Sequence, residues 1–297
     1  MSFSSTFVDA GGIRLHVAHA GDRANPAILF LHGFPEYWAA WRPVMERLAG
    51  RYFVVAPDQR GFNLSDRPAE VEAYRTGQLV ADALAVADAF FPDREFALAG
   101  HDWGASVAYG LAFREPRRVG RLVVANGVHP VCFQRAIFDD PAQRAASQYI
   151  NRLRAPEADA RMAENGYART LSMIEKFSAT GWMTDEARRG YLDAWSRPGA
   201  MRGMLNWYRA TPLVVPAVGE PAAEAPILSL PPETFAVRMP HLVIWGEDDQ
   251  ALRPSCLEGL EAFAPDLRIE RVDGAGHWIL HEKPDRVADL MDTFCTC

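Results

Sequence analysis

The chain has 297 residues, of which 49% are apolar, so it is long enough for one large domain or for a core with an insertion. Its net charge of −7 comes without long runs of one sign, which argues against nucleic acid or an acidic membrane surface as the main partner. No apolar run approaches the ~20 residues that span a bilayer, and the N-terminus lacks a secretion signal, so we expect a soluble cytoplasmic protein.

The cysteines are spaced neither as metal ligands nor as a disulfide scaffold. They are Cys132, Cys256, Cys295 and Cys297. We therefore expect buried or incidental thiols in a reducing compartment, and no metal site.

Strand and helix patterns alternate in the first part of the chain. Strands are predicted over Arg14–His19, Ala27–Leu31, Tyr52–Ala56, Phe96–Ala99 and Leu122–Ala125. Helices are predicted over Trp38–Leu48, Leu79–Phe90 and Ala105–Phe113. This alternation indicates an α/β protein with a mostly parallel central sheet that is flanked by helices on both faces.

The alternation stops near Pro130, where a stretch with only helical patterns begins. Strand patterns return at Leu242–Trp245 and Arg268–Val272, and a last helix is predicted over Pro284–Phe294. The simplest division is a core in two parts, 1–129 and 221–297, interrupted by a helical cap over 130–220. Ligands of such sheets bind at the carboxyl ends of the strands, where an inserted cap would form a lid.

The segment Gly100–Gly104 reads Gly-His-Asp-Trp-Gly and joins a predicted buried strand to a predicted helix. Serine hydrolases place their nucleophile in such a strand–turn–helix, but here the central residue is Asp102. A carboxylate is an anion at neutral pH and can attack an electrophilic carbon without first losing a proton. Asp102 is therefore the candidate nucleophile.

Three other loops supply partners for such a nucleophile. His277 follows the last predicted strand and is the candidate base, while Asp248 and Asp249, after another strand, both qualify as the acid that orients it. The backbone N–H groups of Phe34 and Trp103 could form an oxyanion hole. Phe34 precedes a proline, and this bond is a candidate cis peptide.

These segments resemble the α/β-hydrolase superfamily and, within it, the epoxide hydrolases. The resemblance covers nearly the whole chain and rests on motifs that occur in family order: His32–Glu36, Asp58–Gly61, Gly100–Gly104, Gly246–Asp249 and Gly274–Trp278. It implies the α/β-hydrolase fold with an inserted helical cap. It also implies that Asp249, three residues after a glycine, is the acid of the triad.

The resemblance to epoxide hydrolases extends to tyrosines in the predicted cap. Leu205–Arg209 resembles the cap segment that carries a ring-opening tyrosine in epoxide hydrolases, which assigns that role to Tyr208. Tyr149 is the candidate for a second such tyrosine, and Tyr167 and Tyr191 are less favoured alternatives. Two phenolic hydroxyls can stabilise the negative charge that develops on an opening epoxide oxygen.

The resemblance implies that an apolar epoxide is converted to a vicinal diol through an ester on Asp102. This reaction needs no cofactor. A homodimer is possible. The residues expected to line the substrate pocket are His32, Pro35, Trp103, Trp207 and Trp278.

Four other functions compete with this one. A haloalkane dehalogenase would use the same nucleophile, but its usual asparagine after His-Gly is replaced here by Phe34. A haloacid dehalogenase would need arginines just after the nucleophile, where this chain has Trp103 and Ser106. A non-catalytic receptor would bind a ligand without turnover, and an esterase would favour serine at position 102.

Overall fold

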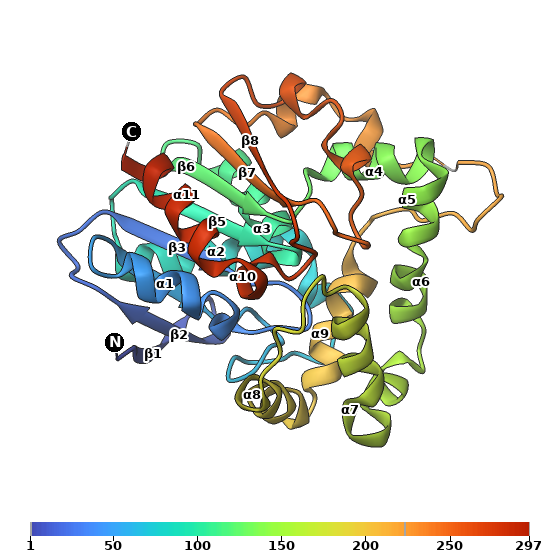
Figure 1. Ribbon diagram of the computed structural model, residues 1–297, viewed down its shortest axis with the longest axis horizontal. Helices are drawn as coiled ribbons and strands as arrows, with labels where there is room; N and C mark the ends of the chain where they lie inside the picture. Colours follow the sequence, from blue (N-terminus) through green and yellow to red (C-terminus); the bar gives the residue numbers. More distant parts are fainter. Residues whose placement is uncertain (1, 223, 297) are drawn as a thin grey trace.

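The computed structural model describes residues 2–222 and 224–296, so Cys297 lies outside the described residues. Its centre is an eight-stranded sheet with the strand order β1-β2-β4-β3-β5-β6-β7-β8 (Figure 1). The strands are β1 (Ser4–Asp9), β2 (Arg14–Ala20), β3 (Ala27–Leu31), β4 (Phe53–Pro57), β5 (Phe96–His101), β6 (Val119–Ala125), β7 (His241–Gly246) and β8 (Leu267–Val272). The pairs from β4 to β8 are parallel, which confirms the predicted fold class.

The sheet begins with one strand that the sequence did not predict. β1 pairs antiparallel with β2 at the edge of the sheet. Only Val8 is buried among its six residues, so no apolar alternation marked it. The edge strand is held by its backbone ladder and not by a buried face.

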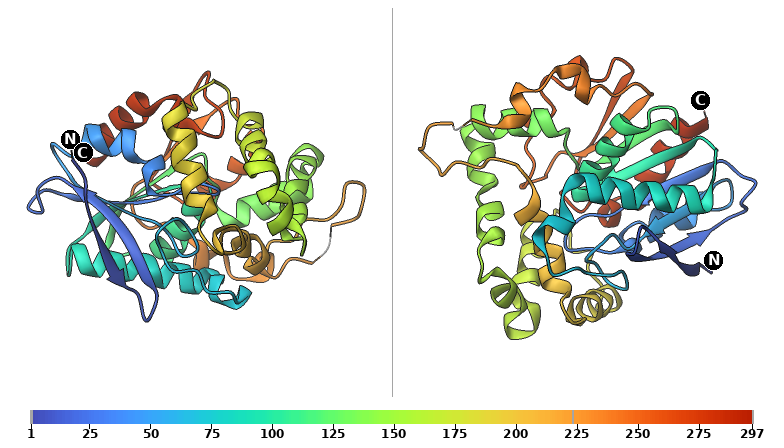
Figure 2. Two further views of the ribbon diagram at one scale, coloured as in Figure 1. Left: turned by 90° about the horizontal axis from the view of Figure 1, so that it is seen from below. Right: turned by 180° about the vertical axis from the view of Figure 1, so that it is seen from behind.

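Helices cover both faces of the sheet, as Figure 2 shows from two sides. One face carries α1 (Arg42–Leu48), α10 (Ile279–Glu282) and α11 (Pro284–Thr296), and the other carries α2 (Thr76–Phe90) and α3 (Trp103–Arg114). The apolar residues of the central strands therefore point into two separate cores. This explains why these strands read as continuous apolar runs.

Short 3₁₀ turns complete the connections. They are η1 (Trp38–Ala40), η2 (Val71–Tyr74), η3 (Pro226–Ser229), η4 (Pro232–Phe235), η5 (Pro254–Leu257) and η6 (Leu260–Ala262). The helix predicted over Trp38–Leu48 is thus divided, because α1 starts only at Arg42, with a proline in its first turn.

The chain between β6 and β7 forms the cap. Its helices are α4 (Pro130–Asp139), α5 (Pro141–Ala146), α6 (Gln148–Arg154), α7 (Ala158–Lys176), α8 (Asp185–Ser196) and α9 (Ala200–Ala210). They gather on one side of the sheet, beyond the carboxyl ends of its parallel strands (Figure 1). No helix in the described part of the chain is both long and apolar enough to cross a membrane.

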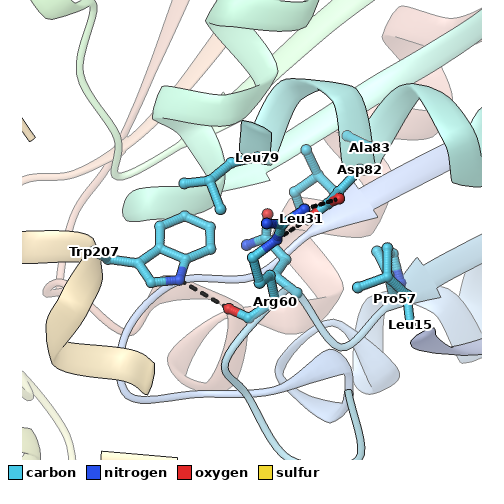
Figure 3. A pocket seen from close by; sticks show the side chains of 9 residues that line it. Leu15, Leu31, Pro57, Arg60, Leu79, Asp82, Ala83 and Trp207 are labelled. Carbon is cyan, nitrogen blue, oxygen red and sulfur yellow. Dashed lines mark hydrogen bonds and ion pairs between the residues drawn. The ribbon is translucent and has the colours of Figure 1, made fainter. Parts of the chain in front are cut away.

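A buried ion pair of the core lies next to a contact with the cap. Arg60, in the loop after β4, donates two hydrogen bonds of 2.6 and 2.7 Å to Asp82 of α2 (Figure 3). The carbonyl of Arg60 accepts a 2.9 Å hydrogen bond from the indole of Trp207 on α9. Burial raises the pKa of Asp82, although Arg60 opposes this shift. Asp82 therefore depends on Arg60 to remain charged.

Replacing Arg60 by Met should destabilise the fold, because it leaves the buried Asp82 carboxylate without its partner. We expect a loss of about 3–5 kcal/mol in the free energy of unfolding, measured by denaturant titration. The double replacement with Asp82→Leu should recover most of this loss, since no charge is then buried. A single variant as stable as the natural protein would show that the pair contributes nothing.

Candidate active site

Asp102 sits in a sharp turn between β5 and α3. Its backbone has φ 50° and ψ −121°, a conformation that a residue with a side chain rarely adopts. Gly104 allows the turn, since a Cβ there would lie only 2.6 Å from the carbonyl oxygen of His32. The turn therefore brings helix and strand close together and presents the Asp102 side chain at the edge of the sheet.

The Asp102 carboxylate is held from the loop after β3. The N–H of Phe34 donates a 2.8 Å hydrogen bond to Oδ1 of Asp102. Gly33 makes this approach possible, because a Cβ there would lie 2.8 Å from the carboxyl carbon. Trp103 is the first residue of α3, so its N–H has no partner within the helix. The Phe34–Pro35 peptide is cis.

His277 lies between two carboxylates. Its Nδ1 is 2.8 Å from Oδ2 of Asp249, and its Nε2 is 3.5 Å from Oδ2 of Asp102. The other oxygen of Asp249 accepts hydrogen bonds from the N–H groups of Ala251 and Leu252, at 2.7 and 2.9 Å. Asp248 is exposed. Of the two candidate acids, the structure places only Asp249 against the imidazole.

Burial and the neighbouring charges act in opposite directions on the pKa values of His277 and Asp249. Burial alone would lower the pKa of His277, but the Asp249 and Asp102 carboxylates raise it well above its usual value. Burial alone would raise the pKa of Asp249, but His277 and the donors around it lower that pKa. The neighbouring carboxylates therefore stabilise the protonated form of the His277 imidazole.

Tyr208 of α9 and Tyr149 of α6 meet in the cavity beside Asp102. Their ring centroids are 6.2 Å apart, and both side chains line a cavity with Asp102. Burial raises the pKa of both phenols well above the usual value, so both remain hydrogen-bond donors. The two alternatives are engaged elsewhere. Tyr167 donates to the carbonyl of Trp195 at 3.0 Å, and Tyr191 donates to Glu36 at 2.8 Å.

The cavity beside Asp102 has a volume of about 380 Å³. Its wall is mostly apolar and comes from α3, the cap and the segment that leads from the cap to β7. Its apolar residues include Phe113, Phe133, Ile150, Ile227, Leu230 and Phe235. A space of this size and character suits an apolar small molecule with one reactive polar group.

The expectation for the pocket residues needs correction, because only Trp103 of the five lines this cavity. His32 is buried beside the sheet, with its ring nitrogens 2.9 Å from the Gly33 carbonyl and 3.0 Å from the Gln59 N–H. Trp278 donates to the carbonyl of Ile174, and Trp207 to that of Arg60. The carbonyl of the buried Pro35 accepts a hydrogen bond from Trp195. These four residues hold the loops and the cap in place.

Residues 26–284 match the family of the α/β hydrolase fold. The chain belongs to the α/β-hydrolase family. It is 37% identical over 287 residues to AB hydrolase superfamily protein YfhM of Bacillus subtilis, and this alignment covers 96% of this chain and 95% of that protein. It is 30% identical over 290 residues to Epoxide hydrolase 4 of Mus musculus, and this alignment covers 95% of this chain and 76% of that protein.

Solved structures point in the same direction. One, described as a novel epoxide hydrolase from metagenomes of hot environments, has a TM-score of 0.90 and 38% identity over 99% of both chains. The epoxide hydrolase of Bacillus megaterium, solved with an inhibitor, has a TM-score of 0.84 and 27% identity over 98% of this chain and 100% of that chain. Within the α/β-hydrolase family, the chain is epoxide hydrolase-like.

Asn126 belongs to the site of this α/β hydrolase, although the sequence did not single it out. Its Nδ2 donates a 2.7 Å hydrogen bond to Oδ2 of Asp249, and its Oδ1 accepts a 2.8 Å bond from the N–H of Gly246. Asn126 directly follows β6, at the carboxyl edge of the sheet where ligands bind. The sequence could have identified Asn126 by this position, because it is a polar residue immediately after an apolar strand.

Proposed function

We propose that this α/β hydrolase is an epoxide hydrolase, which converts an epoxide to a vicinal diol through a hydroxyalkyl ester on Asp102. The observation that supports this best is the arrangement of one cavity. A carboxylate lies on its core side, and two protonated phenols, Tyr149 and Tyr208, lie on its cap side. A nucleophile and two donors on opposite sides are what ring opening by back-side attack requires.

In the first proposed step, Oδ2 of Asp102 attacks a ring carbon, because Oδ1 is held by the N–H of Phe34. The carbon–oxygen bond of the ring breaks, and the oxygen takes a proton from Tyr208 or Tyr149. The ester that forms has lost the charge of Asp102. With one of its two carboxylate neighbours neutral, the pKa of His277 falls, and its proton can pass to the tyrosinate.

In the second proposed step, the neutral His277 takes a proton from a water molecule that attacks the ester carbonyl. The carbonyl oxygen is Oδ1, which already accepts a hydrogen bond from Phe34, and the N–H of Trp103 is the second proposed donor. The tetrahedral intermediate releases the second hydroxyl of the diol, which takes its proton from His277. The acid proton left on Asp102 returns to the imidazole, and the resting charges are restored.

The decisive experiment is a single turnover in ¹⁸O-labelled water with a panel of epoxides and halogenated compounds. We expect epoxide turnover to exceed dehalogenation. The diol of the first turnover should carry unlabelled oxygen from Asp102, and the label should enter the protein. Label that appears directly in that first diol would instead mean direct attack by water, without an ester.

The two tyrosines separate epoxide opening from halide release. Tyr208→Phe and Tyr149→Phe should each lower the alkylation rate by about 10²–10³, as expected for loss of one donor to a developing oxyanion, with little change in ester hydrolysis. Stopped-flow single turnovers resolve the two steps. A halide leaves without a proton, so dehalogenation should tolerate both changes. Full epoxide activity of Tyr208→Phe would remove it from the mechanism.

A further inference from the structure

The loop that carries His277 is held by the cap as well as by the core. The backbone N–H of His277 donates a 3.2 Å hydrogen bond to the carbonyl of Phe177, and the indole of Trp278 donates a 2.8 Å bond to the carbonyl of Ile174. Ile174 lies in the last turn of α7, and Phe177 directly follows that helix. The last carbonyls of a helix can accept such bonds, because the helix offers them no further turn of N–H groups. The proposed base is therefore attached to the end of a cap helix.

Glu282 of α10 joins this loop to the cap a second time. Its Oε2 accepts a 2.5 Å hydrogen bond from the N–H of Gly276, the residue before His277. Its Oε1 accepts bonds from the N–H groups of Ala179 and Thr180, in the cap segment after α7, at 2.6 and 3.2 Å. Hydrogen bonds from N–H groups to a carboxylate are roughly twice as strong as those between neutral groups. One oxygen of Glu282 thus holds the core loop, and the other holds the cap.

The carboxylate of Glu282 is held by backbone groups and not by a cation. The residue is half-buried, and none of the ion pairs in the described part of the chain includes it. The hydrogen bonds that its side chain accepts all come from the backbone N–H groups of the loop before His277 and of the cap segment after α7. The position of this side chain is therefore determined by two backbone segments, one from the core and one from the cap.

The contact between these two segments leaves no room for a side chain at Gly276. A Cβ there would lie 3.0 Å from the nitrogen of Ala179 and 3.0 Å from the carbonyl oxygen of Phe177. Gly276 does not have a positive φ, so glycine is needed here for the close approach of two backbones and not for a turn. The core loop and the cap are therefore so close that a single methyl group would disturb their contact.

The imidazole of His277 must face the ester on Asp102 in the second proposed step. Its Nε2 lies 3.5 Å from Oδ2 of Asp102, while Oδ2 of Asp249 lies 2.8 Å from its Nδ1. Asp249 sets the direction of the ring, but the backbone of His277 sets how far the ring reaches toward Asp102. A proton transfer requires heavy atoms within about 3 Å of each other, directly or through one water. A displacement of about 1 Å can cost on the order of 10² in rate.

We propose that Glu282 is a positioning residue for His277. This proposal rests on the proposed two-step hydrolysis of an epoxide and assigns Glu282 to its second step alone. The Glu282 carboxylate ties the loop of the base to the cap. It thereby keeps Nε2 of His277 at the distance from which it takes a proton from the attacking water. Glu282 does not line the cavity beside Asp102, so it acts only through His277.

Glu282→Gln tests this role, because an amide of nearly the same size has only one accepting oxygen. Either the core loop or the cap segment then loses its acceptor. We expect ester hydrolysis in stopped-flow single turnovers to slow by about 10- to 100-fold, the scale of a displacement of about 1 Å. Alkylation does not use His277 as a base, so its rate should be nearly unchanged. The control Glu258→Gln makes the same chemical change at an exposed residue and should keep both rates.

Gly276→Ala is a second test, which leaves Glu282 and every charge of the protein unchanged. Its added methyl group pushes the core loop and the cap apart, so it should also slow ester hydrolysis and spare alkylation. If Glu282→Gln does not fold, Gly276→Ala decides the proposal by the same two rates.

The pH profile of ester hydrolysis separates positioning from a general loss of stability. Burial lowers the pKa of His277 and the Asp249 carboxylate raises it, so an imidazole that has moved away from Asp249 should have a lower pKa. Asp102 is esterified in this step. His101, whose ring centroid lies 5.2 Å from that of His277, is the same in every variant. Since only the neutral imidazole takes a proton, the rise of the rate with pH should begin at a lower pH in both variants than in the natural protein.

Equal losses in alkylation and ester hydrolysis would overturn the proposal, because they would show that Glu282 only stabilises the fold. A shifted pH profile in Glu282→Gln but not in Gly276→Ala would mean that the charge of Glu282 acts on His277 without holding the loop, and it would also refute the proposal. If the natural protein forms no ester with any epoxide, the proposed function itself fails. An ester that forms and is hydrolysed at the natural rate in both variants refutes the role of Glu282 alone.

Discussion

Replacing His277 by Gln should trap the ester on Asp102. The first step needs only the carboxylate and the cap tyrosines, so alkylation should continue. The second step loses the group that takes a proton from water, and steady-state turnover should fall on the order of 10⁴ or more, as when a triad base is removed. Mass spectrometry of the intact protein should show an increase equal to the mass of the epoxide.

The control for this experiment is the double variant Asp102→Ala with His277→Gln. It retains the cavity but has no nucleophile, so no adduct should form. An adduct in the double variant would mean that another residue is alkylated. Normal turnover of His277→Gln would show that the base lies elsewhere.

Asp249→Asn should be the second most damaging change. An amide can present its NH₂ group to His277 and thereby favour the wrong tautomer of the ring, which can cost on the order of 10⁴ in rate. Asp249 also accepts from Asn126 and from two backbone N–H groups, and an amide cannot accept all of these bonds. The rate of ester hydrolysis in single-turnover experiments measures the effect.

Asp248→Asn is the matched control, because it makes the same chemical change one residue away on an exposed side chain. It should retain nearly full activity. If Asp248→Asn were the slower variant, the assignment of the acid would have to be reversed. Circular dichroism spectra of both variants would separate lost chemistry from lost folding.

The fold was predictable because its signals are local. The strands β3 to β7 are continuous apolar runs, and the turn around Asp102 is marked by glycines on either side. The strand β1 escaped prediction because its polar, exposed residues carry no pattern of burial. Its position is decided by pairing with β2, which is a contact between segments and not a property of one segment.

The site was less predictable wherever packing decides the role of a side chain. The residues alone left Asp248 and Asp249 equivalent, and only the contact with His277 distinguishes them in space. Likewise, Trp207 and Trp278 lie next to motif residues, but backbone carbonyls satisfy their indole N–H groups away from the cavity. Adjacency in sequence says little about which way a helical side chain points.

The unusual backbone conformation of Asp102 affects how such a protein can evolve. A side chain at φ 50° and ψ −121° costs about 1–3 kcal/mol, which the surrounding contacts must offset. Glycine would relieve this cost but would remove the carboxylate that we propose as the nucleophile. Selection for turnover and selection for thermal stability therefore oppose each other at this one position. A related protein that is no longer selected for the proposed activity could replace Asp102 by glycine and would then be more stable to unfolding.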